Sequence, residues 1–167
     1  MTPSFILTGK DGTVVGLGVG ASFTDVGAAG AALRDRAVPL IAGALPFAPT
    51  APAALIAPAA VTGRLPEGPG QPVPGRVGVA SRPEPTVHRQ RVAAAIARLR
   101  DPGPLQKVVL ARALELRAEN GSWDPLAVLH RLLAANPDAY GYLVDLSGAG
   151  GSYAGSTLVG ASPELLV

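Results

Sequence analysis

The chain has 167 residues and a mass of 16.7 kDa, the size of one ordinary domain. Hydrophobic residues make up 48% of it, so it can bury a core, built mainly from Ala, Val and Leu. Fourteen Lys and Arg against 12 Asp and Glu are scattered without a basic stripe, which argues against nucleic acid as a partner. The absence of Cys excludes disulfides and thiolate metal sites. With no signal-like N-terminus and no apolar run near the length of a membrane span, the sequence predicts a cytoplasmic protein that does not interact with a membrane.

Short strands and helices are predicted to alternate along the first half of the chain. The turn signal Gly9-Lys10-Asp11-Gly12 separates two apolar runs and favours a hairpin. The predicted elements are a hairpin of residues 5–8 and 14–19, a helix from Thr24 or Asp25 to near Arg36, and strands at 39–45 and 53–57.

A proline-rich stretch at residues 63–85 predicts an extended surface connection, with an edge strand at 77–80. After it, apolar residues at helical spacing predict an amphipathic helix at 86–100, which Asp101-Pro102-Gly103-Pro104 ends. Residues 107–116 form the strongest strand pattern in the sequence. Their alternation places Lys107, Val109, Ala111, Ala113 and Glu115 on one face, and Val108, Leu110, Arg112, Leu114 and Leu116 on the other.

The last part of the chain predicts one more helix and a second hairpin. Asp124 as N-cap with Pro125 opens the helix, in which Leu126, Leu129 and Leu133 share a stripe, and Asn136-Pro137 closes it. The hairpin joins residues 140–146 and 156–160. A further strand is expected from Glu164, so we expect the chain to stop within an element that would ordinarily pair and continue.

Several polar or glycine-rich features are interpreted as structural. Gly16-Leu17-Gly18-Val19-Gly20 lacks dinucleotide-loop spacing and favours a strand with close backbone packing. His88 and His130 lack partners at ligand spacing and are interpreted as surface or half-buried residues. Four carboxylates lie beside turns or helix ends, where they usually cap: Asp11, Asp25, Asp35 and Asp145.

Lys107 and Glu164 are the two unusual placements. Lys107 is one of only two lysines among 14 basic residues, and it begins the most apolar strand. A desolvated lysine can serve as a neutral base, although a strand-edge lysine that reaches water is the simpler interpretation of the position alone. Glu164 lies between Gly160-Ala161-Ser162-Pro163 and Leu165-Leu166-Val167. A carboxyl group among apolar neighbours can hold a proton at neutral pH and act as a general acid, while an ordinary strand-edge charge is the alternative.

Four segments together resemble the chorismate-utilising enzymes, and most closely isochorismate synthase. They are Lys107-Val108-Val109-Leu110-Ala111-Arg112, Asn136-Pro137 with Tyr140, Leu158 to Leu166, and Gly43-Ala44-Leu45-Pro46-Phe47. The resemblance runs from about Ser4 to Val167. It implies an α+β fold in which helices pack on one side of a mostly antiparallel sheet, with residues 1–167 forming the N-terminal portion of a single domain.

By this resemblance, chorismate is the substrate and isochorismate the product. Lys107 would be the base that activates water, and Glu164 the acid that protonates the departing hydroxyl. Ala161 and Ser162 would contact the substrate. The family's Mg²⁺ would bind the substrate carboxylate through Glu ligands in a C-terminal half that this chain lacks.

The resemblance leaves alternatives open. Lysine at position 107 is shared with salicylate synthases, whereas the amine-forming members typically carry Gln there. Because complete members are more than twice as long, we expect a truncated fragment that is inactive by itself. The alternative from another class is a non-catalytic binding or scaffold domain. The sequence does not distinguish siderophore from menaquinone synthesis, and it gives no oligomeric state.

Overall fold

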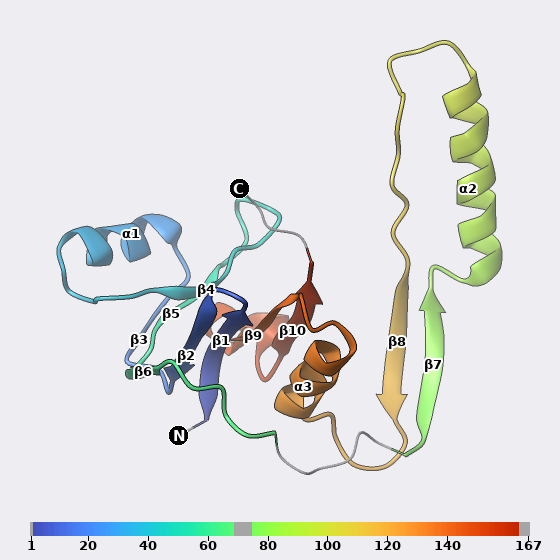
Figure 1. Cartoon of the computed structure of the whole chain (residues 1–167). Helices are drawn as coiled ribbons and strands as arrows, with labels where there is room; N and C mark the ends of the chain where they lie inside the picture. The colour runs from blue at the N-terminus through green and yellow to red at the C-terminus, as the bar shows by residue number, and fades with distance from the viewer. Residues whose placement is uncertain (1, 69–74, 164–167) are drawn as a thin grey trace. The chain divides into compact units, whose positions relative to one another are not determined.

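The computed structural model describes residues 2–68 and 75–163 (Figure 1). The chain divides into two compact units, residues 1–73 with 124–167 and residues 74–123, and each is described by itself. Neighbouring strands in all three described sheets run antiparallel. Together with the three described α-helices, this confirms the predicted α+β class with a mostly antiparallel sheet. Among the described residues, no helix has both the length and the apolar character needed to cross a membrane.

A five-stranded sheet organises the first unit, in the order β10-β9-β1-β2-β6. Its strands are β1 (Pro3–Gly9), β2 (Gly12–Leu17), β6 (Ala60–Thr62), β9 (Tyr140–Asp145) and β10 (Thr157–Ser162). The β1–β2 and β9–β10 pairings confirm both predicted hairpins. Two short 3-10 turns, at Ser147–Ala149 and Gly151–Tyr153, connect β9 to β10.

One row of apolar side chains crosses this sheet. Val15 pairs with Ile6, Ile6 with Leu143, and Leu143 with Val159, so the register places all four on one face. Helix α3 (Pro125–Ala135) covers that face and inserts Leu129, which is fully buried, into the cluster. The helix therefore packs on one side of the sheet, as the resemblance implies.

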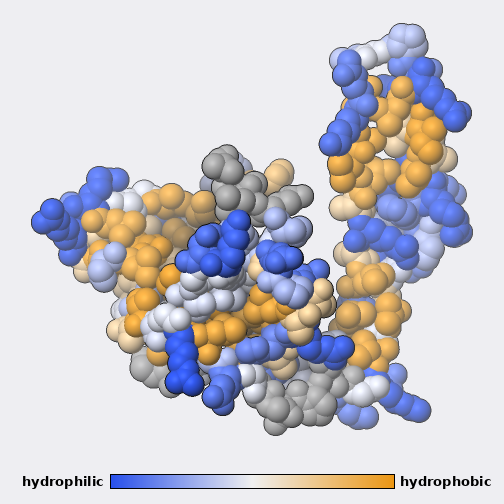
Figure 2. Space-filling model, in the orientation of Figure 1, coloured by the Kyte–Doolittle hydropathy of each residue, from blue (hydrophilic) through white to orange (hydrophobic). Residues whose placement is uncertain are grey.

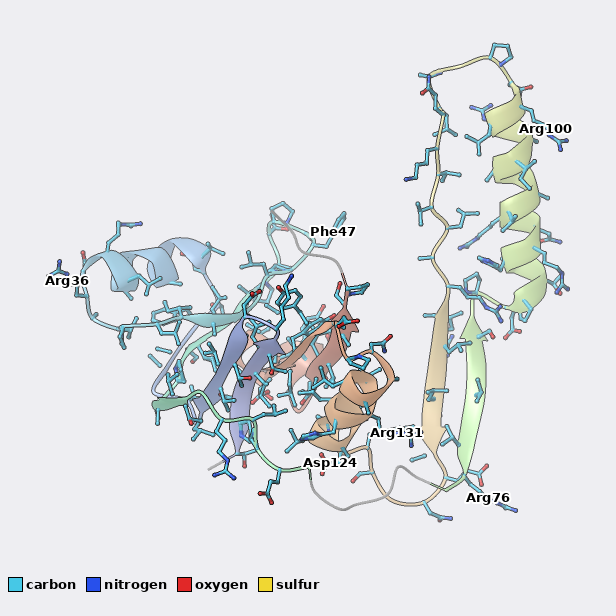
Figure 3. The ribbon with its side chains drawn as sticks, in the orientation of Figure 1. Arg36, Phe47, Arg76, Arg100, Asp124 and Arg131 are labelled. Atoms are coloured by element: carbon cyan, nitrogen blue, oxygen red, sulfur yellow. The ribbon has the colours of Figure 1, made fainter. Side chains whose placement is uncertain are left out.

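Helix α3 begins and ends where the sequence predicts. The Asp124 carboxylate accepts hydrogen bonds from the backbone N–H groups of Leu126, at 2.8 Å, and Ala127, at 3.1 Å. These N–H groups have no partner within the helix, so Asp124 fixes its first turn (Figure 3). At the other end, Asn136 is the C-cap.

A three-stranded sheet, in the order β3-β5-β4, lies in the same unit. It comprises β3 (Ala21–Phe23), β4 (Ala42–Ala44) and β5 (Ala54–Ala57), with helix α1 (Val26–Arg34) nearby in the chain. Every residue of β5 is buried. Ala29 of α1 joins Ala53 and Leu55 in a small second core, which matches the light, alanine-rich core expected from the composition.

The second unit consists of β7 (Val77–Arg82), α2 (Pro85–Arg100) and β8 (Ala113–Ala118). The helix confirms the prediction at 86–100, yet none of its residues is buried. Strands β7 and β8 form a two-stranded ribbon in which Val79 lies opposite Leu116 and Ala80 opposite Glu115. One face of the ribbon is therefore apolar and the other charged.

Two predicted strands need correction, and two strands were missed. Of the strand predicted at 39–45, only Ala42–Ala44 forms, because the pairing with β5 spans only these residues. The strand predicted at 107–116 begins at Ala113, because its partner β7 ends at Arg82, opposite Ala113. Strands β3 and β6 were not predicted. Both are three residues long, and pairing with a neighbour, rather than a local pattern, makes them strands.

Candidate functional site

Lys107 lies in the second unit, between the end of α2 and the start of β8. Its side chain is exposed, as are all residues from 101 to 114. The segment Lys107–Arg112 has no strand partner, and no backbone hydrogen bond joins it to another described residue. The prediction that Lys107 begins a paired strand is therefore wrong for the described chain. The desolvation that a lysine base requires is not supplied by the residues around it.

The end of β10 holds the second group of predicted site residues, in the first unit. Ala161 pairs with Gly141 and Ser162 with Tyr140. Because neighbouring side chains on a strand point to opposite faces, Ala161 lies on the face covered by α3 and Ser162 on the other. A ligand bound to one face of the sheet could therefore contact the side chain of Ala161 or that of Ser162, but not both. The predicted acid, Glu164, lies outside the described residues.

The predicted site residues thus divide between the two units. The structure brings Ala161 and Ser162 together at the end of one strand, and Lys107 belongs to the other unit. Each group is described only within its own unit.

Gly160 of the same motif has a packing role. A Cβ atom at Gly160 would collide with the ring of Tyr142, its partner on β9. On the opposite face, a Cβ at Gly141 would come within 2.6 Å of Leu133 on α3. Both glycines allow a large neighbouring side chain to cover the strand, so they shape the sheet surface next to Ala161 and Ser162.

The segment Gly43-Ala44-Leu45-Pro46-Phe47 forms β4 and the loop after it. Gly43 has φ of +150°, and a Cβ there would collide with the carbonyl oxygen of Ala54, so the strand pairing requires glycine at this position. Phe47 is fully exposed, and Figure 3 shows its side chain projecting from the loop. The loop borders an open apolar groove in the same unit, lined in part by Leu45, Phe47, Tyr153 and Leu158.

Most of the carboxylates, histidines and glycines that the sequence predicts to be structural have structural contacts in the fold. Asp25 caps α1 by accepting from Ala28 N–H at 2.7 Å, and Asp145 accepts from Ser147 N–H at 2.9 Å. His130 is half-buried and bonds the Pro66 carbonyl at 3.0 Å. His88 is also half-buried. In the glycine-rich segment, Gly16 packs against Pro58, and Gly20 lies close to the Ala57 carbonyl.

Asp11 is also structural, but through a tertiary contact and not a local cap: its carboxylate accepts a short hydrogen bond from the Tyr140 hydroxyl. This bond raises the pKa of Tyr140, as does the negative charge of Asp11. Asp11 lies in a predicted turn and Tyr140 in a family motif, but a local sequence pattern cannot predict a hydrogen bond between positions so far apart.

The charged face of the β7–β8 ribbon holds a carboxylate between two arginines. Glu115 accepts from Arg117 Nε at 2.7 Å and from Arg82 Nε at 2.9 Å. The hydrogen bond from Arg117, followed by that from Arg82, holds the pKa of Glu115 below its usual value of 4.5. The alternation of the sequence predicts the face of Glu115, but no local pattern predicts its partners.

Within residues 2–68 and 75–163, no group of three or more carboxylate or histidine side chains is placed to hold a metal ion. These residues therefore form no Mg²⁺ site of their own, and the expectation that the ligands lie outside this chain stays a prediction.

The profile of the chorismate binding enzyme family matches residues 48–167. The chain belongs to the chorismate binding enzyme family. The match includes both the Lys107–Arg112 segment and the residues of β10.

The relatives of this family member are isochorismate synthases by name. A Mycobacterium tuberculosis protein, provisionally named isochorismate synthase MenF, is 46% identical over 172 aligned residues, covering 99% of this chain. Isochorismate synthase DhbC of Bacillus subtilis is 35% identical, and EntC of Escherichia coli is 33% identical, each over 77% of this chain. The chain spans 45% of the length of MenF and 33% of the lengths of DhbC and EntC.

Proposed function

We propose that this chain is the N-terminal portion of an isochorismate synthase and carries the base and the acid of the reaction. The observation that carries the proposal is the 46% identity to MenF over almost the whole chain, since the same region contains both sequence motifs. The names of DhbC and EntC support the same activity.

The proposed reaction moves the hydroxyl of chorismate from ring carbon 4 to carbon 2. Lys107 in its neutral form takes a proton from water while the water oxygen bonds to carbon 2. The ring double bonds shift, the bond from carbon 4 to its hydroxyl breaks, and Glu164 gives that hydroxyl a proton. One water enters and one leaves, so substrate and product are isomers. Afterwards Lys107 holds an extra proton and Glu164 lacks one, and exchange with solvent resets both groups.

The exposure of Lys107 supports the second part of the proposal, that the 167-residue chain alone has no appreciable turnover. A base that acts at neutral pH needs a desolvated amine held against the substrate, and most of an enzyme's acceleration comes from such positioning. In the described chain Lys107 is exposed on an unpaired segment. Because the described residues also form no metal site, we derive no step through Mg²⁺.

A chimera tests this proposal. The chain is assayed with chorismate and Mg²⁺ alone, and also joined to the part of M. tuberculosis MenF that it does not match. We expect isochorismate from the chimera and none from the chain alone. Pyruvate release would instead indicate the salicylate synthase alternative. A folded chimera that leaves chorismate unchanged would indicate a non-catalytic domain and contradict the proposal, and turnover by the chain alone would overturn its second part.

A further inference from the structure

Strand β8 stops where its neighbour stops, although its sequence pattern continues. Strand β7 ends at Arg82, and α2 begins at Pro85. Beyond the last ladder pair, Arg82 with Ala113, the chain from Arg112 back to Lys107 stays outside the described sheets, and its residues are exposed. Figure 1 shows this stretch as a long trace that leads into β8.

We infer that Lys107–Arg112 is a continuation of β8 that becomes a strand when a strand from another polypeptide segment pairs with it, namely the part of the family enzymes that this chain does not match. This inference rests on the proposed function. It goes beyond the proposed function because it assigns the segment Lys107–Arg112 as an interaction surface that accepts a strand.

The local sequence supports strand formation. Val108 and Val109 are β-branched, and no Pro or Gly interrupts residues 105–120. The Arg112 guanidinium donates to the Ser81 hydroxyl at 2.7 Å. Because Ser81 lies opposite Leu114, this bond keeps Arg112 on the face of Leu114, as an uninterrupted strand requires. The alternation of β8 therefore extends at least one residue beyond its last ladder pair.

The apolar side chains of the ribbon next to this segment are also exposed in the described part of the chain. On the ribbon's apolar face Val79 is 63% exposed and Leu114 59% exposed. In the segment itself Val109, which has the alternation of the opposite face, is 81% exposed. Figure 2 shows hydrophobic residues on the surface of both the ribbon and the helical part of this unit. Two strands alone are marginally stable in water, and an unpaired edge with apolar side chains is a template for an added strand.

The lengths of the relatives support this choice of occupant. The family profile matches this segment and the ribbon, so both belong to the enzyme fold. More than half of MenF, and about two thirds of DhbC and EntC, lie outside the aligned region. That remaining polypeptide is long enough to supply both a strand and an apolar cover. A second copy of this chain is the competing occupant, and the experiment separates the two.

Pairing would have a consequence for Lys107. A regular extension of β8 places Lys107 on the face that carries Val109, Ala111 and Ala113. The amine would then project from a fixed strand beside Val109, on the face that further along carries Glu115 and its two arginines. Strand addition is thus the step that fixes the position of the proposed base.

Hydrogen exchange of the peptide containing residues 107–112 measures the pairing directly. We expect these amides to exchange at nearly intrinsic rates in the 167-residue chain and about 100-fold or more slowly in the MenF chimera. A chimera whose β1 and β9 amides are protected, while those of 107–112 are not, would overturn the inference. Protection in the chain alone that grows with protein concentration would also overturn it, in favour of a second copy.

Proline substitutions supply a matched test, since proline has no N–H to donate. Neighbouring N–H groups in a strand point to opposite edges, so V109P and L110P together sample both edges. In the chain alone, both should leave the unfolding midpoint unchanged. In the chimera, at least one should abolish the protection of 107–112, while L105P, which lies before the segment, should not. Unchanged protection in both segment variants would contradict the inference.

Amide protection tests the strand addition, and isochorismate formation tests the proposed function, so the two can fail separately. Protection of 107–112 in a chimera that makes no isochorismate would retain the strand addition and reject the enzyme activity. Isochorismate formation without that protection would retain the activity and reject the strand addition.

Discussion

The hydroxyl of Tyr140, the first residue of β9, donates a hydrogen bond to the carboxylate of Asp11, in the turn between β1 and β2. The ring of Tyr140 also lies against Gly9, where a Cβ atom would collide with it. These contacts join the first hairpin to the start of β9, two segments separated by most of the chain.

The first prediction concerns the pH dependence of this bond. Because Asp11 raises the pKa of Tyr140 above its ordinary value of 10.0, the bond stabilises the folded chain fully below pH 10. The contribution is lost as the pH rises through the raised pKa. We expect Y140F to lower the urea midpoint at pH 8, and the difference from wild type to shrink towards pH 11. The control Y142F lacks this partner, and an equal effect in both variants would contradict the prediction.

Loss of the cap on α3 gives a second prediction. D124A leaves two backbone N–H groups at the start of the helix without their acceptor, and we expect it to lower the free energy of unfolding by about 1 kcal/mol. D138A, at an exposed position just after the helix, is the matched control and should change stability by less than about 0.5 kcal/mol. Urea denaturation of both variants checks this, and equal losses would refute it.

The core beneath α3 gives a third prediction. Leu129 is fully buried against Ile6, Val15 and Leu143, so L129A should lower the free energy of unfolding by about 2–5 kcal/mol. L158A removes the same atoms from a side chain that is 42% exposed and should cost clearly less. Thermal or urea unfolding compares the two, and a similar loss in both would show that α3 does not cover the sheet as described.

Glu115 gives a fourth prediction, local to the second unit. Because Arg117 and Arg82 lower its pKa below 4.5, the carboxylate supports the ribbon fully above pH 4.5. That support is lost as the pH falls through the lowered pKa. We expect β7 and β8 amides to lose protection between pH 6 and pH 3, relative to intrinsic exchange rates. E115Q should already show reduced protection at pH 6 and little further change, whereas a wild-type pH response in E115Q would contradict the prediction.

Local sequence signals predicted much of the first unit. Asp124 with Pro125, the leucine stripe of α3 and both hairpins depend on residues near one another in the chain, and they appear where expected. The Tyr140–Asp11 bond could not be predicted in this way, because the pairing of β1 with β9 creates it.

The strand predicted at 107–116 also shows that local sequence does not determine which segments pair. Its alternation is real, and β8 follows it from Ala113 to Ala118. Whether Lys107–Arg112 pairs depends on a neighbouring strand, which no local pattern supplies. The family motifs therefore suggest which residues form the candidate site, and that assignment stays a prediction, whereas no local pattern predicts the surroundings of Lys107.

The central claim, that Lys107 is the base of a chorismate isomerisation, is tested most directly by kcat for isochorismate formation in the MenF chimera. We predict that K107A lowers kcat by about 100-fold or more, while K10A, which removes the other lysine from the β1–β2 turn, leaves it unchanged. The thermal midpoints of the chimera and both variants should agree. A K107A chimera that folds and turns over chorismate at the parent rate would contradict the account.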